Sequence, residues 1–152
     1  MTDPADIGTA AIRSQAHPAV LNALRDLAGA GGVWITVNGQ CMTPRLRDGD
    51  RVLVTRCRCY LPGDVLAFRA WDGRLLVHRL LGYRLRGIRF ELVTAADSAV
   101  RSDVPIPIAS VIGRVVDCDP AAATPLVTGF DRRSALRRFL VLAWQRLRGC
   151  RR

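Results

Sequence analysis

The sequence contains no lysine, and all 23 basic residues among its 152 are arginine. A lysine base or a lysine Schiff base is therefore excluded from any catalytic mechanism. Acidic residues number only 13, so the formal net charge is +10. Eight of the arginines lie in residues 131–152, beside a single acidic residue. Because the rest of the chain is close to neutral, the composition does not favour nucleic-acid binding by the protein as a whole.

Long apolar runs are also missing. The longest near the C-terminus, residues 139–144, has six residues, whereas a membrane-spanning helix needs about 18. The N-terminus carries Asp3 and Asp6 and lacks the basic and apolar regions of a secretory signal. Five cysteines are an odd number in a chain long enough to fold without disulfides, which favours a reducing compartment. We therefore expect a cytoplasmic protein, with peripheral contact at the inner face of the membrane as an alternative.

Apolar residues make up 49% of the chain and charged residues 24%, which is a normal balance for one globular domain. Residues 1–17 predict a flexible N-terminus, and residues 18–32 predict a helix followed by a glycine-rich linker. Short runs rich in β-branched residues then follow, separated by turn signals such as Asp72-Gly73. The predicted strands are Val33–Val37, Arg51–Thr55, Val65–Arg69, Leu75–Leu81, Ile88–Thr94 and Val111–Val116. This pattern predicts a mainly β, antiparallel domain over residues 33–119.

The C-terminal part predicts a linker over residues 120–130 and a basic amphipathic helix over residues 131–152, with Ser134 as its N-cap. The spacing predicts one apolar face, formed by Leu136, Phe139, Leu140, Ala143 and Leu147. Two interpretations of this helix stay open. It packs on the domain, or it lies on an anionic membrane surface with its arginines around the apolar face.

Only two histidines are available for catalysis. His17 lies in the expected flexible N-terminus, and His78 lies in a predicted strand. A single histidine in a strand is more often structural than catalytic, so His78 by itself is a weak candidate.

Cys41 has more informative surroundings. It stands in the hexapeptide Gly39-Gln40-Cys41-Met42-Thr43-Pro44, between a glycine that permits unusual backbone angles and a proline that fixes the chain. A thiol at such a junction is exposed and held in position. Its thiolate is an effective nucleophile beside a protonated histidine, whereas a free cysteine is more commonly buried and inert.

The hexapeptide and the segment Gly49–Val54 resemble the nucleophile box of the signal peptidase I and SOS-repressor (LexA-like) peptidase superfamily, which reads Gly-x-Ser-Met-x-Pro followed by Gly-Asp and a strand. Four more segments match in order, most closely to the archaeal and endoplasmic-reticulum type of signal peptidase. They are Pro62–Leu66 (the second Gly-Asp strand), Val77–Leu80 (the His-Arg box), Asp97 with Asp103 (the two acids) and Ile112–Val116 (the closing strand). The resemblance covers residues 33 to 116, and five ordered boxes are a specific signal.

The departures from the superfamily narrow the chemistry. Cys41 replaces the nucleophilic serine, Ala96 replaces the glycine before the first acid, and Ser98 replaces the asparagine after it. The membrane anchor usual in the family is not found. Without lysine, the Ser-Lys dyad of the bacterial enzymes and the repressors is excluded, which leaves the branch that uses Ser-His-Asp.

The resemblance implies a signal peptidase/LexA-like β fold and an endopeptidase with Cys41 as nucleophile and His78 as general base and acid. Asp103 would orient the imidazole, and Asp97 is the alternative. Gln40 is a candidate oxyanion donor, and Met42 would form the floor of the substrate cleft or the core. We expect the substrate to be an extended peptide or leader segment with small residues near the cut, bound along a sheet edge.

Two rival functions remain, and no metal or cofactor is expected. A catalytically inactive module would bind a peptide or partner in the same cleft; the presence of His78 with both acids favours the enzyme. A self-processing repressor relative is less favoured, because the N-terminal region is short and lysine is absent. Cys57-Arg58-Cys59, with Cys118 distant in sequence, does not supply the four ligands of a zinc site and predicts a hairpin end.

Overall fold

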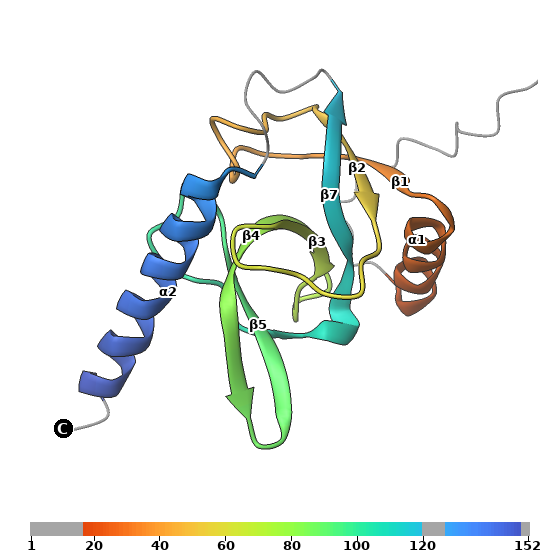
Figure 1. Ribbon diagram of the computed structural model, residues 1–152. Coiled ribbons are helices and arrows are strands. Elements are labelled where there is room, and N and C mark those ends of the chain that lie inside the picture. The colour runs from red at the N-terminus through yellow and green to blue at the C-terminus, as the bar shows by residue number, and fades with distance from the viewer. Residues whose placement is uncertain (1–16, 120–126, 150–152) are drawn as a thin grey trace, which may run out of the picture.

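The computed structural model describes residues 17–119 and 127–149, and it shows one seven-stranded antiparallel sheet with two α-helices (Figure 1). The predicted mainly β fold is confirmed. The expected flexible segment 1–16, most of the expected linker (120–126) and the last three residues lie outside the described residues. In chain order the elements are α1 (Pro18–Ala30), β1 (Val33–Thr36), β2 (Arg51–Thr55), β3 (Val65–Arg69), β4 (Leu75–Arg86), β5 (Arg89–Ala95), β6 (Ile106–Pro107), the 3-10 helix η1 (Ile108–Ser110), β7 (Val111–Asp119) and α2 (Gly129–Gly149).

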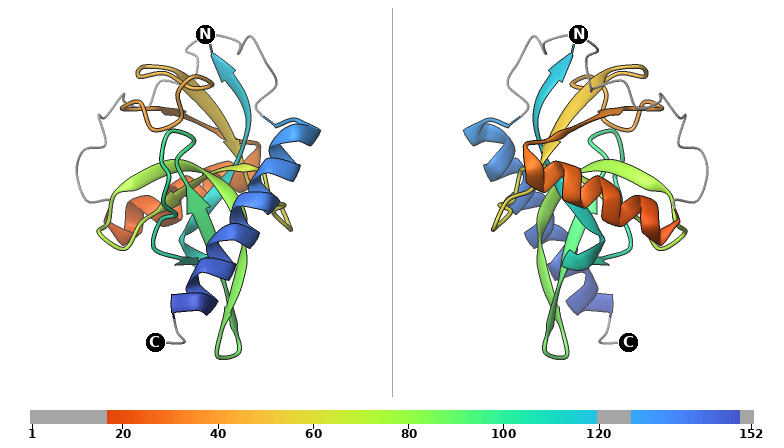
Figure 2. Two further views of the ribbon diagram at one scale, coloured as in Figure 1. Left: turned by 90° about the vertical axis from the view of Figure 1, so that its left-hand side faces the viewer. Right: turned by 90° about the vertical axis from the view of Figure 1, so that its right-hand side faces the viewer.

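Helix α1 begins and ends where the sequence predicts. The His17 Nδ1 atom accepts a hydrogen bond from the backbone of Ala19 (3.3 Å), and Pro18 occupies the first helical position. Gly31, with a φ of 146°, ends the helix in a conformation that other residues rarely adopt. The helix packs against the core beneath β7, on the opposite side of the molecule from α2 (Figure 2).

The sheet has the strand order β1-β2-β7-β3-β4-β5-β6, so β7 lies between β2 and β3. The closing strand of the domain therefore separates two strands that are close in sequence. Consequently, the expectation that Cys57-Arg58-Cys59 ends a hairpin is wrong, because this segment connects two strands that do not pair with each other. At one edge of the sheet, β1 pairs only with β2, so its outer side has no strand partner among the described residues.

The β4–β5 hairpin is longer than predicted. We expected a strand to end at Leu81 and the next to begin at Ile88, but β4 continues to Arg86 and the turn lies at Gly87–Ile88. Ile88 is 96% exposed at the tip, which projects from the rest of the sheet alongside α2 (Figure 1).

Helix α2 begins at Gly129, six residues before the first helical position that an N-cap at Ser134 predicts. Thr128 and Asp131 form a reciprocal cap: the Asp131 amide donates to the Thr128 hydroxyl (3.2 Å), and the Thr128 amide donates to the Asp131 carboxylate (2.7 Å). This Thr-x-x-Asp arrangement is a variant of the capping box and marks the true start of the helix.

The buried face of α2 also differs from the predicted face. Ala135, Phe139 and Leu142 pack against the β4–β5 hairpin, whereas Leu136 and Leu140 are exposed. Phe139 fits over Gly82, where an added Cβ would lie 2.9 Å from the ring. The helix thus packs on the domain. Contact of its exposed apolar residues with an anionic membrane stays a prediction.

Candidate active site

His78 lies on β4, where it is opposite Leu66 of β3 and is 7% exposed. Its Nδ1 atom is 2.7 Å from Oδ2 of Asp103. The same carboxylate oxygen accepts a hydrogen bond from the Thr94 hydroxyl (2.7 Å), and the Asp103 amide donates to the Thr94 carbonyl (2.8 Å). Thr94 of β5 therefore holds Asp103 through both its hydroxyl and its backbone carbonyl. Asp103 in turn fixes the orientation of the His78 imidazole.

His78 and Asp103 each stabilise the charged form of the other. Burial lowers the pKa of His78, but hydrogen bonds and charge interactions with Asp103 and Cys41 outweigh it and raise the pKa to about 9. Burial raises the pKa of Asp103, yet the hydrogen bonds from His78 and Thr94 bring it below its ordinary value. At neutral pH the site therefore holds an imidazolium between a carboxylate and a cysteine.

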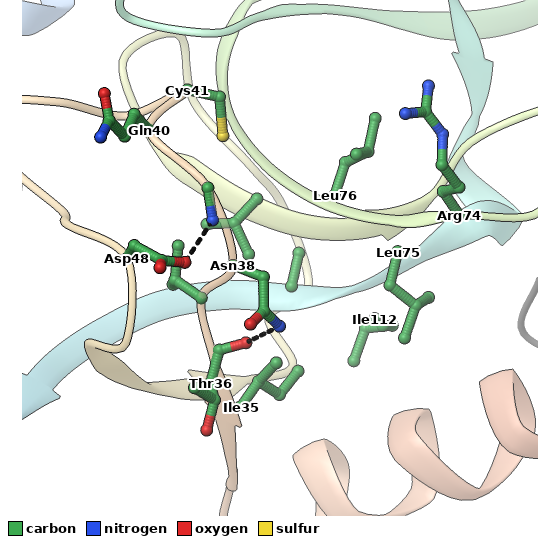
Figure 3. Close-up of a pocket in the computed structure, with 14 residues that line it drawn as sticks. Ile35, Thr36, Asn38, Gln40, Cys41, Asp48, Arg74, Leu75, Leu76 and Ile112 are labelled. Atoms are coloured by element: carbon green, nitrogen blue, oxygen red, sulfur yellow. Dashed lines mark hydrogen bonds between the residues drawn. The ribbon is translucent and has the colours of Figure 1, made fainter. Parts of the chain in front are cut away.

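Cys41 lies on the turn after β1 and is half-buried, with its side chain on the rim of a cavity (Figure 3). Its carbonyl accepts two hydrogen bonds from Ser98, one from the amide (3.2 Å) and one from the hydroxyl (3.0 Å). The loop that carries the acids therefore also holds the backbone of the candidate nucleophile. The Cys41 amide donates to no other described residue, so it is available to a substrate.

The turn around Cys41 is held by buried side chains and by hydrogen bonds to two carboxylates. Met42 and Leu46 are completely buried in the core on either side of the Thr43–Pro44 peptide. The Gly39 amide donates to the Asp48 carboxylate (2.6 Å), and the Arg47 amide donates to the Asp50 carboxylate (2.7 Å). The Gly-Asp pair of the motif thus closes the loop that presents the thiol.

The structure does not place Asp97 on the imidazole. Its two carboxylate oxygens accept hydrogen bonds from Nε and an Nη of Arg79, both at 2.7 Å. Arg79 is 5% exposed and also donates to the Gly63 carbonyl (2.7 Å). The His-Arg dipeptide therefore points its two side chains at the two acids separately: Asp103 for His78 and Asp97 for Arg79.

Helix α2 contributes contacts to the site that the sequence patterns did not reveal. Arg138 donates to the carbonyls of Ala96 and Ala99, in the loop that carries the acids. Asp131 accepts a hydrogen bond from Arg45 (2.6 Å), four residues after Cys41. The Thr-x-x-Asp signal could have located Asp131 as a capping residue, but nothing in the sequence relates either residue to these loops.

The cavity beside Cys41 measures about 430 Å³ and lies between β1 and β4 (Figure 3). Apolar side chains line part of it (Ile35, Val37, Ala67, Leu75, Val77 and Ile112), and polar side chains such as Asn38, Asp48 and Arg74 line the rest. Gln40 is exposed at its rim, and in Figure 3 its amide points away from the Cys41 sulfur. Met42 belongs to the core rather than to the lining of the cavity.

None of the other described cysteines lines the cavity beside Cys41. Cys57 and Cys59 lie between β2 and β3, and Cys118 is buried in β7. Within residues 17–119 and 127–149, no three histidine, cysteine or acidic side chains are grouped so that they could hold a metal ion.

A family model described as Peptidase S24-like matches residues 9–116. The chain belongs to this family. The matched segment of this S24-like protein contains Cys41, His78 and Asp103 together with the sheet that positions them, and it stops before α2. Membership supports a peptidase-type function, consistent with the β fold. No curated protein matches the chain. Among the described residues of this S24-like chain, no helix is long and apolar enough to cross a membrane.

Proposed function

We propose that the protein is an endopeptidase of the S24-like family that uses Cys41 in place of serine, with His78 and Asp103 as its partners. The observation that carries the proposal is the environment of His78, which hydrogen-bonds to Asp103 through Nδ1 and whose pKa is raised by Asp103 first and by Cys41 second. Nucleophile, base and orienting acid are recognised by such geometry and not by their order in the chain.

The chemistry follows from this arrangement. With Nδ1 engaged by Asp103, Nε2 is the ring nitrogen left for the thiol, and a thiolate beside an imidazolium is an effective nucleophile. The thiolate attacks the carbonyl carbon of the scissile bond and forms a C–S bond. His78 then donates its Nε2 proton to the leaving amine as the C–N bond breaks. Water, deprotonated by the now neutral imidazole, hydrolyses the thioester and regenerates the thiol. The Cys41 amide, which is unengaged among the described residues, would stabilise the oxyanion.

The groove beside Cys41 fits an extended peptide. The outer edge of β1 is unpaired. Residues 75–78 of β4 pair with β3 on one side, while pairing with β5 begins only at Arg79. Both free edges border the same cavity, so a substrate strand can hydrogen-bond to either or both. The aliphatic lining supports the preference for small apolar side chains near the cut, as the resemblance to signal peptidases implies.

Thiol alkylation tests the proposed nucleophile without a known substrate. The thiolate is the form that reacts with iodoacetamide, and at pH 6 an ordinary thiol is almost wholly protonated. As the proposed nucleophile, Cys41 should therefore react roughly 10²-fold faster than exposed Cys59 in the same molecule. Peptide mass spectrometry measures both rates. His78→Gln should abolish the difference, whereas the control His17→Gln, which changes the other histidine, should preserve it. Equally slow labelling of Cys41 and Cys59 would instead support the inactive binding module.

A peptide aldehyde with alanines at its C-terminal end tests the peptidase reaction itself. The Cys41 thiol should add to the aldehyde carbon and form a thiohemiacetal, with the proton moving to the oxygen. Intact-protein mass spectrometry should detect one adduct, which is absent in Cys41→Ala. A reactive Cys41 that forms no adduct with any small-residue aldehyde would contradict the proposed substrate class.

A further inference from the structure

Most of the arginines that are buried or half-buried among the described residues have acidic partners. The ion pairs join Arg45 to Asp131, Arg79 to Asp97, Arg84 to Glu91, and Arg132 to Asp64. Three arginines on the α1 side of the molecule, one half-buried and two exposed, form no such ion pair. Arg25, Arg56 and Arg58 line one cavity of about 580 Å³ between α1, the segment after β2, and η1.

None of these three guanidinium groups forms an ion pair with a described residue, and the Nε atom of Arg25 is buried without a hydrogen-bond partner. Gathering like charges without a counter-charge is unfavourable, and an unsatisfied buried donor adds to this. The cavity therefore has the electrostatic character of a site for an anion, which guanidinium groups bind through paired N–H donors.

The walls of the cavity hold the arginines in place. The Arg56 amide donates to the Ala28 carbonyl at the end of α1 (2.9 Å), and its side chain passes over Gly29. Tyr60, 5% exposed, forms another wall. Burial raises the pKa of Tyr60, while the charges of Arg56 and Arg25 lower it, so both guanidinium groups lie near the phenol.

An apolar groove of about 680 Å³ adjoins this cavity, and Ile108 and Ala109 line both. The groove is bordered by Trp71 and Phe90, which are 62% and 66% exposed. The two hollows are also joined by a hydrogen bond from the Tyr83 hydroxyl to the Tyr60 carbonyl (2.7 Å). Large apolar side chains exposed together commonly mark a binding surface.

We propose that the cavity and groove together bind one molecule of an anionic lipid. Its phosphate or carboxylate head lies among Arg25, Arg56 and Arg58, and its chain lies along Trp71 and Phe90. The arginines of the cavity favour an anionic head group, and the adjoining apolar groove favours a hydrocarbon chain. The site shares no lining residue with the cavity beside Cys41, so it is independent of the proposed peptidase activity.

The test uses Trp71 as the reporter in a Trp34→Phe/Trp144→Phe background, which leaves Trp71 as the single tryptophan. Dodecyl phosphate, added below the concentration at which it forms micelles, should shift the emission to the blue and saturate at one molecule per chain. Dodecyl maltoside, which has the chain without the charge, and inorganic phosphate, which has the charge without the chain, should each bind at least about tenfold more weakly. Equal binding of the maltoside would overturn the cationic half of the proposal.

Matched variants then locate the site. Arg25→Gln/Arg56→Gln should weaken dodecyl phosphate binding by about tenfold or more, and Phe90→Ser should weaken it separately. Arg133→Gln/Arg137→Gln removes the same charge from exposed positions on α2 and should leave it unchanged. Equal losses in the two double variants would show non-specific attraction and overturn the proposal. So would adsorption to phosphatidylglycerol vesicles without binding of the monomer, or preferential binding of an acidic apolar peptide.

Discussion

The two halves of the candidate active site are built differently. His78 and Thr94 lie on the adjacent strands β4 and β5, and Asp103 is bound to both. Cys41 lies on a turn, where its carbonyl is held by Ser98 of another loop. Residues within a sheet share its cooperative stability, whereas loop positions depend on a few local contacts. The geometry of the base and acid is therefore part of the fold, and the position of the thiol is the adjustable part.

The largest expected effect separates the two acids, Asp103 and Asp97, which lie on the loop after β5. Asp103→Asn removes the charge beside His78, so the imidazole loses its orientation and its raised pKa. Peptide cleavage should fall by about 10²- to 10⁴-fold, and the fold should lose the part of the His78 stabilisation that the Asp103 carboxylate supplies. Asp97→Asn instead removes the charge that accepts two hydrogen bonds from the 5%-exposed guanidinium of Arg79, which should destabilise the fold by roughly 3 kcal/mol.

Cleavage kinetics and urea denaturation of both variants measure this difference. NMR titration of the imidazole adds a readout that depends on orientation and charge alone, because only Asp103→Asn should lower the His78 pKa substantially. Similar titration curves for the two variants would contradict the assignment of Asp103 as the orienting acid.

The second prediction concerns alkaline pH. The pKa of His78 is about 9 in the folded protein and about 6.5 in an unfolded chain, so the folded state binds the proton more tightly. The resulting stabilisation is fully present below pH 6.5 and is lost as the pH rises through 9. It amounts to about 3 kcal/mol as an upper value, because part of it is shared with Asp103 and Cys41. Urea denaturation between pH 6 and pH 10 measures it.

The matched control for this prediction is Asp103→Asn, whose stability should fall less over the same pH interval because its imidazole lacks the carboxylate. An identical decline in both proteins would show that other groups control the alkaline limb. The imidazolium is also the proton donor of the proposed reaction, so cleavage should decline over the same interval.

Much of the sheet could be predicted from the sequence, because alternating β-branched residues and glycine turns are local signals. The order of strands could not, since β7 inserts between β2 and β3 through contacts distant in sequence. The motif spacing identified His78 and two acids as candidates. The family resemblance favoured Asp103 over Asp97 as the orienting acid, but the residues alone could not decide, because the choice depends on Thr94 and Arg79, which lie on neighbouring strands.

The sequence also could not predict which face of helix α2 is buried. Its composition permits more than one apolar face, and the face that packs is selected by the space above Gly82, which admits Phe139. Two adjacent arginines then have different environments: Arg138 reaches the carbonyls of Ala96 and Ala99, and Arg137 is exposed. Periodicity alone cannot distinguish them, since the difference depends on the rotation of the helix.

The third prediction uses this pair to test the loop half of the site. Arg138→Gln should loosen the loop that holds Cys41 and reduce the rate of Cys41 alkylation by about fivefold to tenfold, corresponding to one or two lost charge-assisted hydrogen bonds. Arg137→Gln removes the same charge from an exposed position and should leave the rate unchanged. The His78 pKa should be similar in both, because the sheet half stays intact. Equal rates in the two variants would show that α2 does not position the nucleophile.

The smallest expected effect comes from the direct contact between the loops. Ser98→Ala removes the hydroxyl that donates to the Cys41 carbonyl but keeps the backbone amide that donates to the same oxygen. Loss of one neutral hydrogen bond of an exposed residue corresponds to about 1 kcal/mol, so alkylation of Cys41 should slow by roughly threefold to fivefold. Ser102→Ala is the matched control, because this serine lies on the same loop and its hydroxyl bonds to no described residue. If both variants react as fast as the unmodified protein, the amide contact alone holds the turn. A loss as large as that expected for Asp103→Asn would mean that the position of the thiol, more than the charge of the imidazole, limits its reactivity.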